Sequence, residues 1–88
     1  PMPEAQALRR LLVEAAARAS KHMEAVPDLA NAHRFLERYM EGKTVSEIAR
    51  DLGVSREWCS RTFRRQALEM ASMQFVRLVS EEGRDQEI

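Results

Sequence analysis

The chain has 88 residues, and its charged residues balance to a formal net charge of zero. This length fits one small domain, and 44% apolar with 32% charged residues is typical of a folded chain. One cysteine excludes an internal disulfide, and together with two histidines it does not make a zinc site. No apolar run reaches the length of a membrane span. We therefore expect a cytoplasmic protein with no cofactor, no metal and no membrane partner.

Three glycines, three prolines and many helix-forming residues favour an all-α fold, a small bundle of four to five helices. The first helix is expected over residues 4–25, ended by Pro27. Its apolar residues recur at spacings of three and four and predict one buried stripe: Leu8, Leu12, Ala15, Ala16, Ala19 and Met23. A second helix is expected over 29–41, with Asp28 as its N-cap and Gly42 just past its end.

Thr44 and Glu47 form a capping box, which predicts a short third helix over 45–52. Gly53 is suited to a tight turn because it adopts positive φ without steric cost. Ser55 is the expected N-cap of a fourth helix that has no clear stop before Gly83. The pattern leaves open whether residues 55–82 form one helix or two.

The zero net charge hides an uneven distribution along the chain. Residues 53–79 carry five arginines against two glutamates, a net charge of +3, and residues 80–88 carry one arginine against four acidic residues, a net charge of −3. We divide the chain into one domain, residues 1–80, and an acidic flexible tail, residues 81–88. The tail is expected to weaken non-specific DNA binding at low salt.

Residues 44–66 have the features of a helix-turn-helix. Ile48 and Ala49 give the first helix a buried face, with an alanine small enough for the next helix to cross closely. Residues 41–65 resemble the helix-turn-helix of bacterial transcription regulators, specifically the fourth region of sigma factors and the C-terminal domains of LuxR-type response regulators. The resemblance implies a DNA-binding domain whose second motif helix enters the major groove.

The resemblance places six residues of the fourth helix against DNA: Ser55, Arg56, Glu57, Ser60, Arg61 and Arg64. Arginine pairs with guanine and glutamate accepts from cytosine, so these residue types suit base recognition. Arg61, Arg64 and Arg65 are alternatively suited to phosphates, and Thr44 and Ser46 to a phosphate at the positive end of the third helix.

The fourth helix departs from the family pattern at Cys59 and Thr62, which predicts a buried face rotated toward Cys59, Phe63 and either Gln66 or Ala67. Cys59 is interpreted as a small core residue rather than a redox sensor. Trp58 has two interpretations: it stacks against DNA, or it packs on the first or third helix.

The function predicted is sequence-specific binding of duplex DNA by a bacterial transcription regulator or its DNA-binding module, without enzymatic activity. Two alternatives remain: a helical protein-interaction module, and the DNA-reading part of a transposase or recombinase. Ion pairs between the arginines of the fourth helix and Glu14, Glu37 or Glu41 would favour the interaction module. The apolar stretch 67–79 predicts a homodimer through the C-terminal helix.

Overall fold

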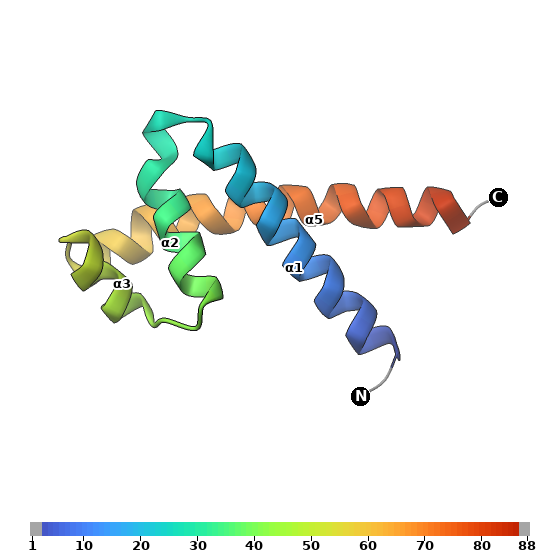
Figure 1. The fold of residues 1–88 in the computed structure, drawn as a ribbon, viewed down its shortest axis with the longest axis horizontal. Helices are drawn as coiled ribbons and strands as arrows, with labels where there is room; N and C mark the ends of the chain where they lie inside the picture. The colour runs from blue at the N-terminus through green and yellow to red at the C-terminus, as the bar shows by residue number, and fades with distance from the viewer. Residues whose placement is uncertain (1–2, 87–88) are drawn as a thin grey trace.

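The computed structural model describes residues 3–86, and within them the chain is all-α without a strand (Figure 1). Helix α1 spans Pro3–Glu24, a single 3₁₀ turn η1 spans Pro27–Leu29, α2 spans Ala30–Met40 and α3 spans Val45–Leu52. The last helix is continuous: α4 (Arg56–Trp58), a π-helical segment η2 (Cys59–Arg64) and α5 (Arg65–Gln86). Residues 55–82 therefore do not form two helices, and the expected all-α bundle is confirmed.

The core lies where α2, α3 and η2 meet under the C-terminal half of α1. Phe35 on α2 is completely buried, as are Met23, Ile48 and Cys59 from the three other helices. Leu52, Val54 and Phe63 are partly buried and pack against this cluster. Burial of a large apolar side chain stabilises the fold by about 1.5–3 kcal/mol, so these few residues hold α3 and the helix that follows it to the rest of the chain.

Helices α2 and α3 each end at a glycine. Gly42 and Gly53 have φ angles of 94° and 71°, the left-handed conformation expected of them. At Gly53 the N–H groups of Gly53 and Val54 donate to the carbonyls of Arg50 and Ala49, at 3.2 and 3.0 Å. Gly42 lies in the same hydrogen-bonding pattern at the end of α2. Both ends are Schellman motifs, which satisfy the last carbonyls of a helix.

The expected N-cap at Asp28 is wrong. Pro27, Asp28 and Leu29 form the 3₁₀ turn η1, and α2 begins one residue later with Leu29 at its N-cap and no side-chain cap. Pro27 suits the first position of that turn because its φ is already fixed and its missing N–H is not needed there. Because Asp28 lies inside this 3₁₀ turn, it is not at the N-cap of α2.

Helices α1 and α5 cross each other, as Figure 1 shows. The residues of α1 at this crossing are small, since Ala15 and Ala19 are buried, and Ala67 and Leu78 of α5 are buried as well. Beyond the crossing the same stripe of α1 is only partly covered by the described residues: Leu8 and Leu12 are 50% and 51% exposed, contrary to expectation. We call residues 3–14 the α1 arm.

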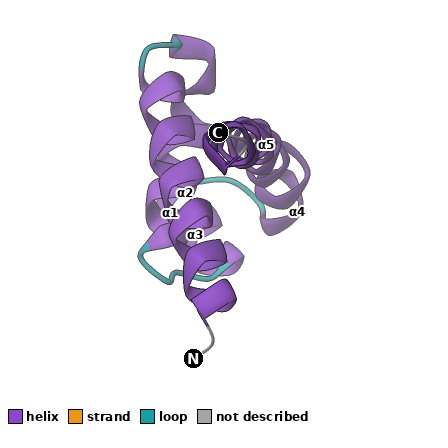
Figure 2. Ribbon diagram, turned by 90° about the vertical axis from the view of Figure 1, so that its right-hand side faces the viewer, coloured by secondary structure: helices purple, strands orange, loops and turns teal. Residues whose placement is uncertain are grey.

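The molecule is flat and extended. Seen along α5, α1 passes to one side of that helix (Figure 2), and the smallest dimension of the backbone is 17 Å, about two helix layers. Its radius of gyration is 14.6 Å, against about 12 Å for a compact domain of this length. Residues 81–86, assigned to a flexible tail from the sequence, continue α5; residues 87–88 lie outside the described part.

Candidate nucleic-acid interface

The turn between α3 and α4 sets the direction of the helix that follows. After Gly53 and Val54, Ser55 has extended backbone angles and its Oγ accepts a hydrogen bond from the Trp58 N–H at 3.1 Å. This is the N-cap predicted from the sequence. The cap uses the hydroxyl oxygen as an acceptor, so the hydroxyl hydrogen of Ser55 stays available to a ligand.

The continuous helix after Ser55 has one buried and one exposed side. Cys59 and Ala67 are fully buried and Phe63 packs between them against the core, which confirms the rotated face predicted for this helix. Six predicted site residues of this helix are exposed, and Ser60 is partly buried; the exposed ones are Arg56, Glu57, Trp58, Arg61, Arg64 and Arg65. The predicted site residues between positions 55 and 65 therefore lie together on one helix beside the turn.

The π-helical segment was not predicted from the sequence. It covers Cys59–Arg64, which includes Ser60 and Arg61. A π-helix has hydrogen bonds from residue i to i+5 and therefore a wider turn than an α-helix, and such segments are frequent at functional sites. The wider turn changes which exposed side chains line up, so a face drawn for an ideal α-helix does not apply here.

Three arginines of this helix carry charges that no acidic group in the described part of the chain neutralises. Arg56, Arg61 and Arg64 are exposed and form no ion pair with a residue of the 3–83 range. Arg65 lies 3.9 Å from Glu69, and both side chains are about two-thirds exposed, so this contact is weak. The arginine row is therefore open to an anionic partner.

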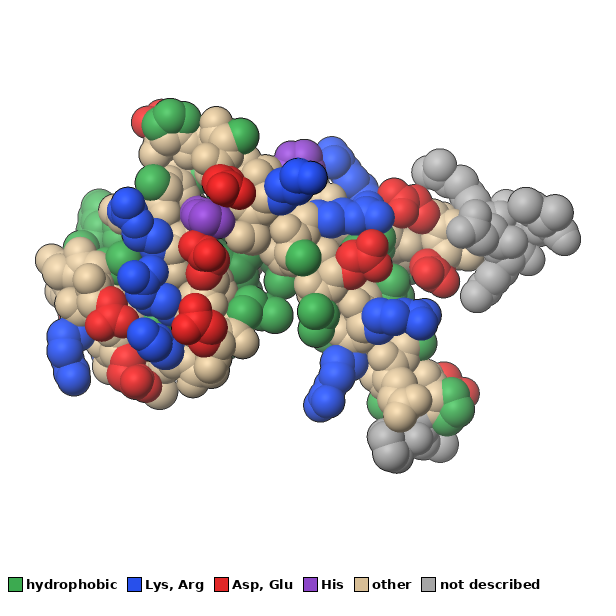
Figure 3. Space-filling view, viewed as in Figure 1, with side chains coloured by type: hydrophobic (Ala, Val, Ile, Leu, Met, Phe, Trp, Pro, Cys, Tyr) green, Lys and Arg blue, Asp and Glu red, His purple; other side chains and the backbone are tan. Residues whose placement is uncertain are grey.

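None of the three acidic residues that would have favoured an interaction module forms an ion pair with the arginine row, and Glu41 forms no ion pair within the 3–83 range. Glu14 lies 3.3 Å from Arg18, and Glu37 lies 3.4 Å from His33, each within its own helix. Neither carboxylate reaches the arginine row. Figure 3 shows mixed basic and acidic side chains over the face formed by α2 and α3, which is not a uniformly basic surface.

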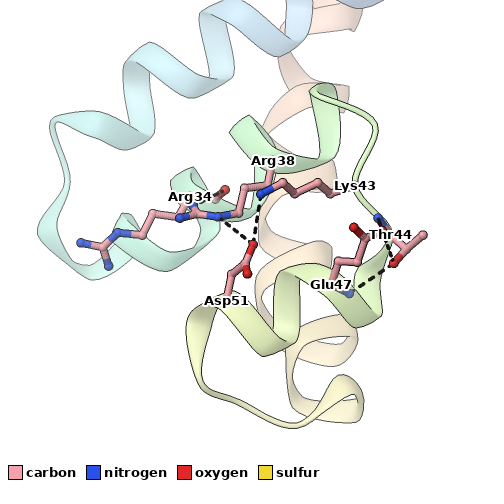
Figure 4. A network of polar contacts seen from close by, with 6 residues as sticks. All are labelled: Arg34, Arg38, Lys43, Thr44, Glu47 and Asp51. Carbon is pink, nitrogen blue, oxygen red and sulfur yellow. Dashed lines mark hydrogen bonds and ion pairs between the residues drawn. The ribbon is translucent and has the colours of Figure 1, made fainter.

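The N-terminus of α3 already holds a negative group. Thr44 Oγ1 accepts from the Glu47 N–H at 3.2 Å, and Glu47 Oε1 accepts from the Thr44 N–H at 3.1 Å and from its hydroxyl at 3.0 Å (Figure 4). These hydrogen bonds to Thr44 lower the pKa of the Glu47 carboxyl below its usual value. A phosphate near Thr44 and the exposed Ser46 would compete with this carboxylate, so this helix end is a poorer anion site than the sequence suggests.

Asp51 joins α3 to the residues at the end of α2. Its Oδ2 lies 3.2 Å from Lys43 Nζ and 3.6 Å from Arg38 Nε, and Arg38 Nη1 donates to the Arg34 carbonyl at 3.3 Å (Figure 4). All three charged side chains of the pairs are 30–39% exposed, so the pairs contribute at most about 1 kcal/mol. Their role is to fix the spacing of α2 and α3. Sequence reasoning missed them because the partners are eight and thirteen residues apart.

Trp58 and Cys59 are adjacent and have opposite environments. Trp58 is 50% exposed, so it is not a core residue and half of its side chain is open to solvent. Cys59 is fully buried, as interpreted from the sequence, and burial raises the pKa of its thiol. A thiol with a raised pKa has little of the reactive thiolate form at neutral pH.

The part of the chain that the structure describes has no cluster of three or more side chains suited to a metal ion. Within the same residues, every helix is too short or too polar to cross a bilayer. Comparison of the chain with protein-family models, curated proteins and solved structures finds no match.

Proposed function

We propose that the chain binds duplex DNA in a sequence-specific manner, as a bacterial transcription regulator or its DNA-binding module acting in the cytoplasm. The observation that carries the proposal is the unpaired row of Arg56, Arg61 and Arg64 on the helix that follows a Gly53 turn. A helix presented in this way fits the major groove, which is about 12 Å wide.

The N-terminal end and the exposed side of this helix suit different parts of the DNA. Ser55, Arg56 and Glu57 lie at its N-terminal end, the end that contacts bases in helix-turn-helix proteins. Arg61, Arg64 and Arg65 follow on the exposed side and suit phosphates or guanines. Trp58, half exposed between these groups, is positioned to contact a sugar or a thymine methyl group.

Few positive charges support this interface, so we expect non-specific affinity to be modest. Each phosphate contact contributes about 0.9 to the slope of log affinity against log salt concentration. With the four arginines of residues 56–65 in contact with phosphates, the slope is expected near −3 to −4. Recognition then depends on base contacts rather than on the overall charge of the chain.

The experiment begins with selection of bound duplexes from a random pool at 100 mM salt, followed by measurement of affinity for the consensus. The fluorescence of Trp58, the single tryptophan, reports binding in the same samples. The double variant Arg61→Ala/Arg64→Ala is expected to lose at least tenfold in affinity. The matched control Arg10→Ala/Lys21→Ala removes the same charge from exposed positions of α1 and is expected to bind as the wild type does.

The absence of any enriched sequence, together with wild-type affinity in Arg61→Ala/Arg64→Ala, would overturn the proposal. An equal loss in the two double variants would show binding by overall charge rather than by the helix after Gly53.

A further inference from the structure

A second apolar stripe runs along α5, on a different side from the buried Gln74 and Leu78. Its members recur at spacings of four, three, one and three residues, which places them on one side of the helix: Leu68, Ser72, Phe75, Val76 and Val79. Val76 and Val79 are 63% and 46% exposed, so the described residues leave much of this stripe open to solvent.

The α1 arm brings two more apolar side chains to the same surface. An open groove of about 250 Å³ lies between the helices and is lined by residues without charge: Leu12, Ala15, Leu68, Ala71, Ser72, Phe75 and Val76. Leu8 lies one turn before Leu12 on the same stripe of α1. We call this surface, made of the groove, Leu8 and Val79, the crossing surface.

The solvent-accessible area of the chain exceeds that of a compact monomer by about the area that one partner buries in an interface. The protein exposes 6426 Å², whereas a folded monomer of 10.1 kDa is expected to expose about 5,300 Å². The excess of about 1,100 Å² is similar to the roughly 800 Å² that each partner buries in a protein interface of standard size. The large radius of gyration has the same origin, since the α1 arm and the end of α5 diverge from the crossing (Figure 1).

We propose that the crossing surface is covered by the same surface of a second copy, related by a two-fold axis. In a two-fold interface each patch meets its own counterpart, so one contact is made twice. The chain supplies both halves of this contact: the stripe of the α1 arm and the stripe of α5. In the dimer, Leu8 and Leu12 of one copy pack along Val76 and Val79 of the other.

The charges at the rim support a second copy as the occupant. Arg9 follows Leu8 at the edge of the α1 stripe, and Glu82 lies one turn after Val79 at the edge of the α5 stripe. Both side chains are exposed and form no ion pair within the 3–83 range. The packing of α1 against the partner's α5 therefore brings opposite charges together at both ends of the interface. The sequence had indicated only the C-terminal helix, and the α1 arm is the addition.

The test is the molar mass of the 88-residue chain in solution without DNA, so its outcome is separate from that of the proposed DNA binding. Light scattering after gel filtration is expected to give about 20 kDa for the wild type, twice the mass of one chain. Val76→Glu is expected to give a monomer with an unchanged circular dichroism spectrum. Met40→Glu is the matched control, because Met40 is 50% exposed at the end of α2 and does not line the groove of the crossing surface.

A monomeric wild type at 100 μM, a dimeric Val76→Glu, or an equal loss in Met40→Glu would overturn the proposal. A second pair of variants tests the arrangement even if Val76→Glu does not fold. Arg9→Glu is expected to weaken the dimer by about threefold to tenfold, and Glu82→Arg added to the same chain is expected to restore it. A double variant weaker than Arg9→Glu alone would overturn the pairing of α1 with the partner's α5.

Discussion

Arg18 on α1 and Glu81 on α5 form an ion pair beside the helix crossing, with Nη1 3.4 Å from Oε1. Glu81 belongs to the segment assigned to a flexible tail from the sequence. In the structure it lies on the last turns of α5 and contacts α1, far from the arginine row at the other end of the continuous helix (Figure 1).

This position limits what the acidic residues do to DNA binding. Sixteen residues of α-helix separate Arg65 from Glu81, a rise of about 24 Å. The Debye length is about 10 Å at 0.1 M salt and 30 Å at 0.01 M. We expect Glu81→Gln to tighten non-specific DNA binding in 10 mM salt and to leave it unchanged in 150 mM salt. Tighter binding at both concentrations would mean that the acidic segment reaches the DNA itself.

The capping box of α3 gives a stability prediction. Thr44→Ala removes the acceptor for the Glu47 N–H and is expected to lower the free energy of unfolding by about 1 kcal/mol. Thr44→Ser keeps the hydroxyl and is expected to stay near the wild type. Ser46→Ala, an exposed position in the same helix, serves as the control and is expected within about 0.5 kcal/mol, measured by urea denaturation.

The same cap predicts a pH dependence. The pKa of Glu47 is lowered by its hydrogen bonds with Thr44, so the carboxylate stabilises the fold above its unfolded pKa, near 4.5. This stabilisation is lost as the pH falls through the lower, folded-state pKa. The melting temperature of the wild type is therefore expected to exceed that of Glu47→Gln most at pH 7, and the gap is expected to close below pH 4.5. A gap that is constant from pH 7 to 3 would contradict the role of the charge.

Two glycines predict opposite effects of the same substitution. Gly53 has a φ of 71° with open space around a Cβ, so Gly53→Ala is expected to destabilise by roughly 1 kcal/mol through backbone strain alone. Gly83 lies within α5, also in open space, and Gly83→Ala is expected to stabilise by up to about 1 kcal/mol. Thermal unfolding measures both changes. Equal effects of the two variants would mean that the turn is not left-handed, or that α5 has ended before residue 83.

The sequence predicted the features that depend on local chemistry. The capping box at Thr44, the left-handed Gly53 and the cap at Ser55 each need residues within four positions of each other, and all are present. The rotated buried face with Cys59 and Phe63 follows from helical periodicity alone. These elements position the candidate site, which is why its main residues were predicted together.

The features that were not predicted depend on contacts between distant segments. Periodicity predicted burial of Leu8 and Leu12, because it identifies a stripe but not where the neighbouring helix diverges from it. Asp28 has the chemistry of an N-cap, but Pro27 starts the turn before it. The π-helical segment has no local signal in the sequence, and it lies where Cys59 and Phe63 of the same helix pack in the core.

The continuous helix from Arg56 to Gln86 joins two surfaces that the proposals treat separately. Its first turns present the arginine row, and its last turns leave the body of the molecule beside the α1 arm. Because one hydrogen-bonded backbone spans both surfaces, a rotation of α5 about its axis also turns the arginines. The π-helical segment, which has more residues per turn than an α-helix, lies between the two ends of the helix. The position of the C-terminal end of α5 and the direction of the arginine side chains are therefore linked through one continuous helix.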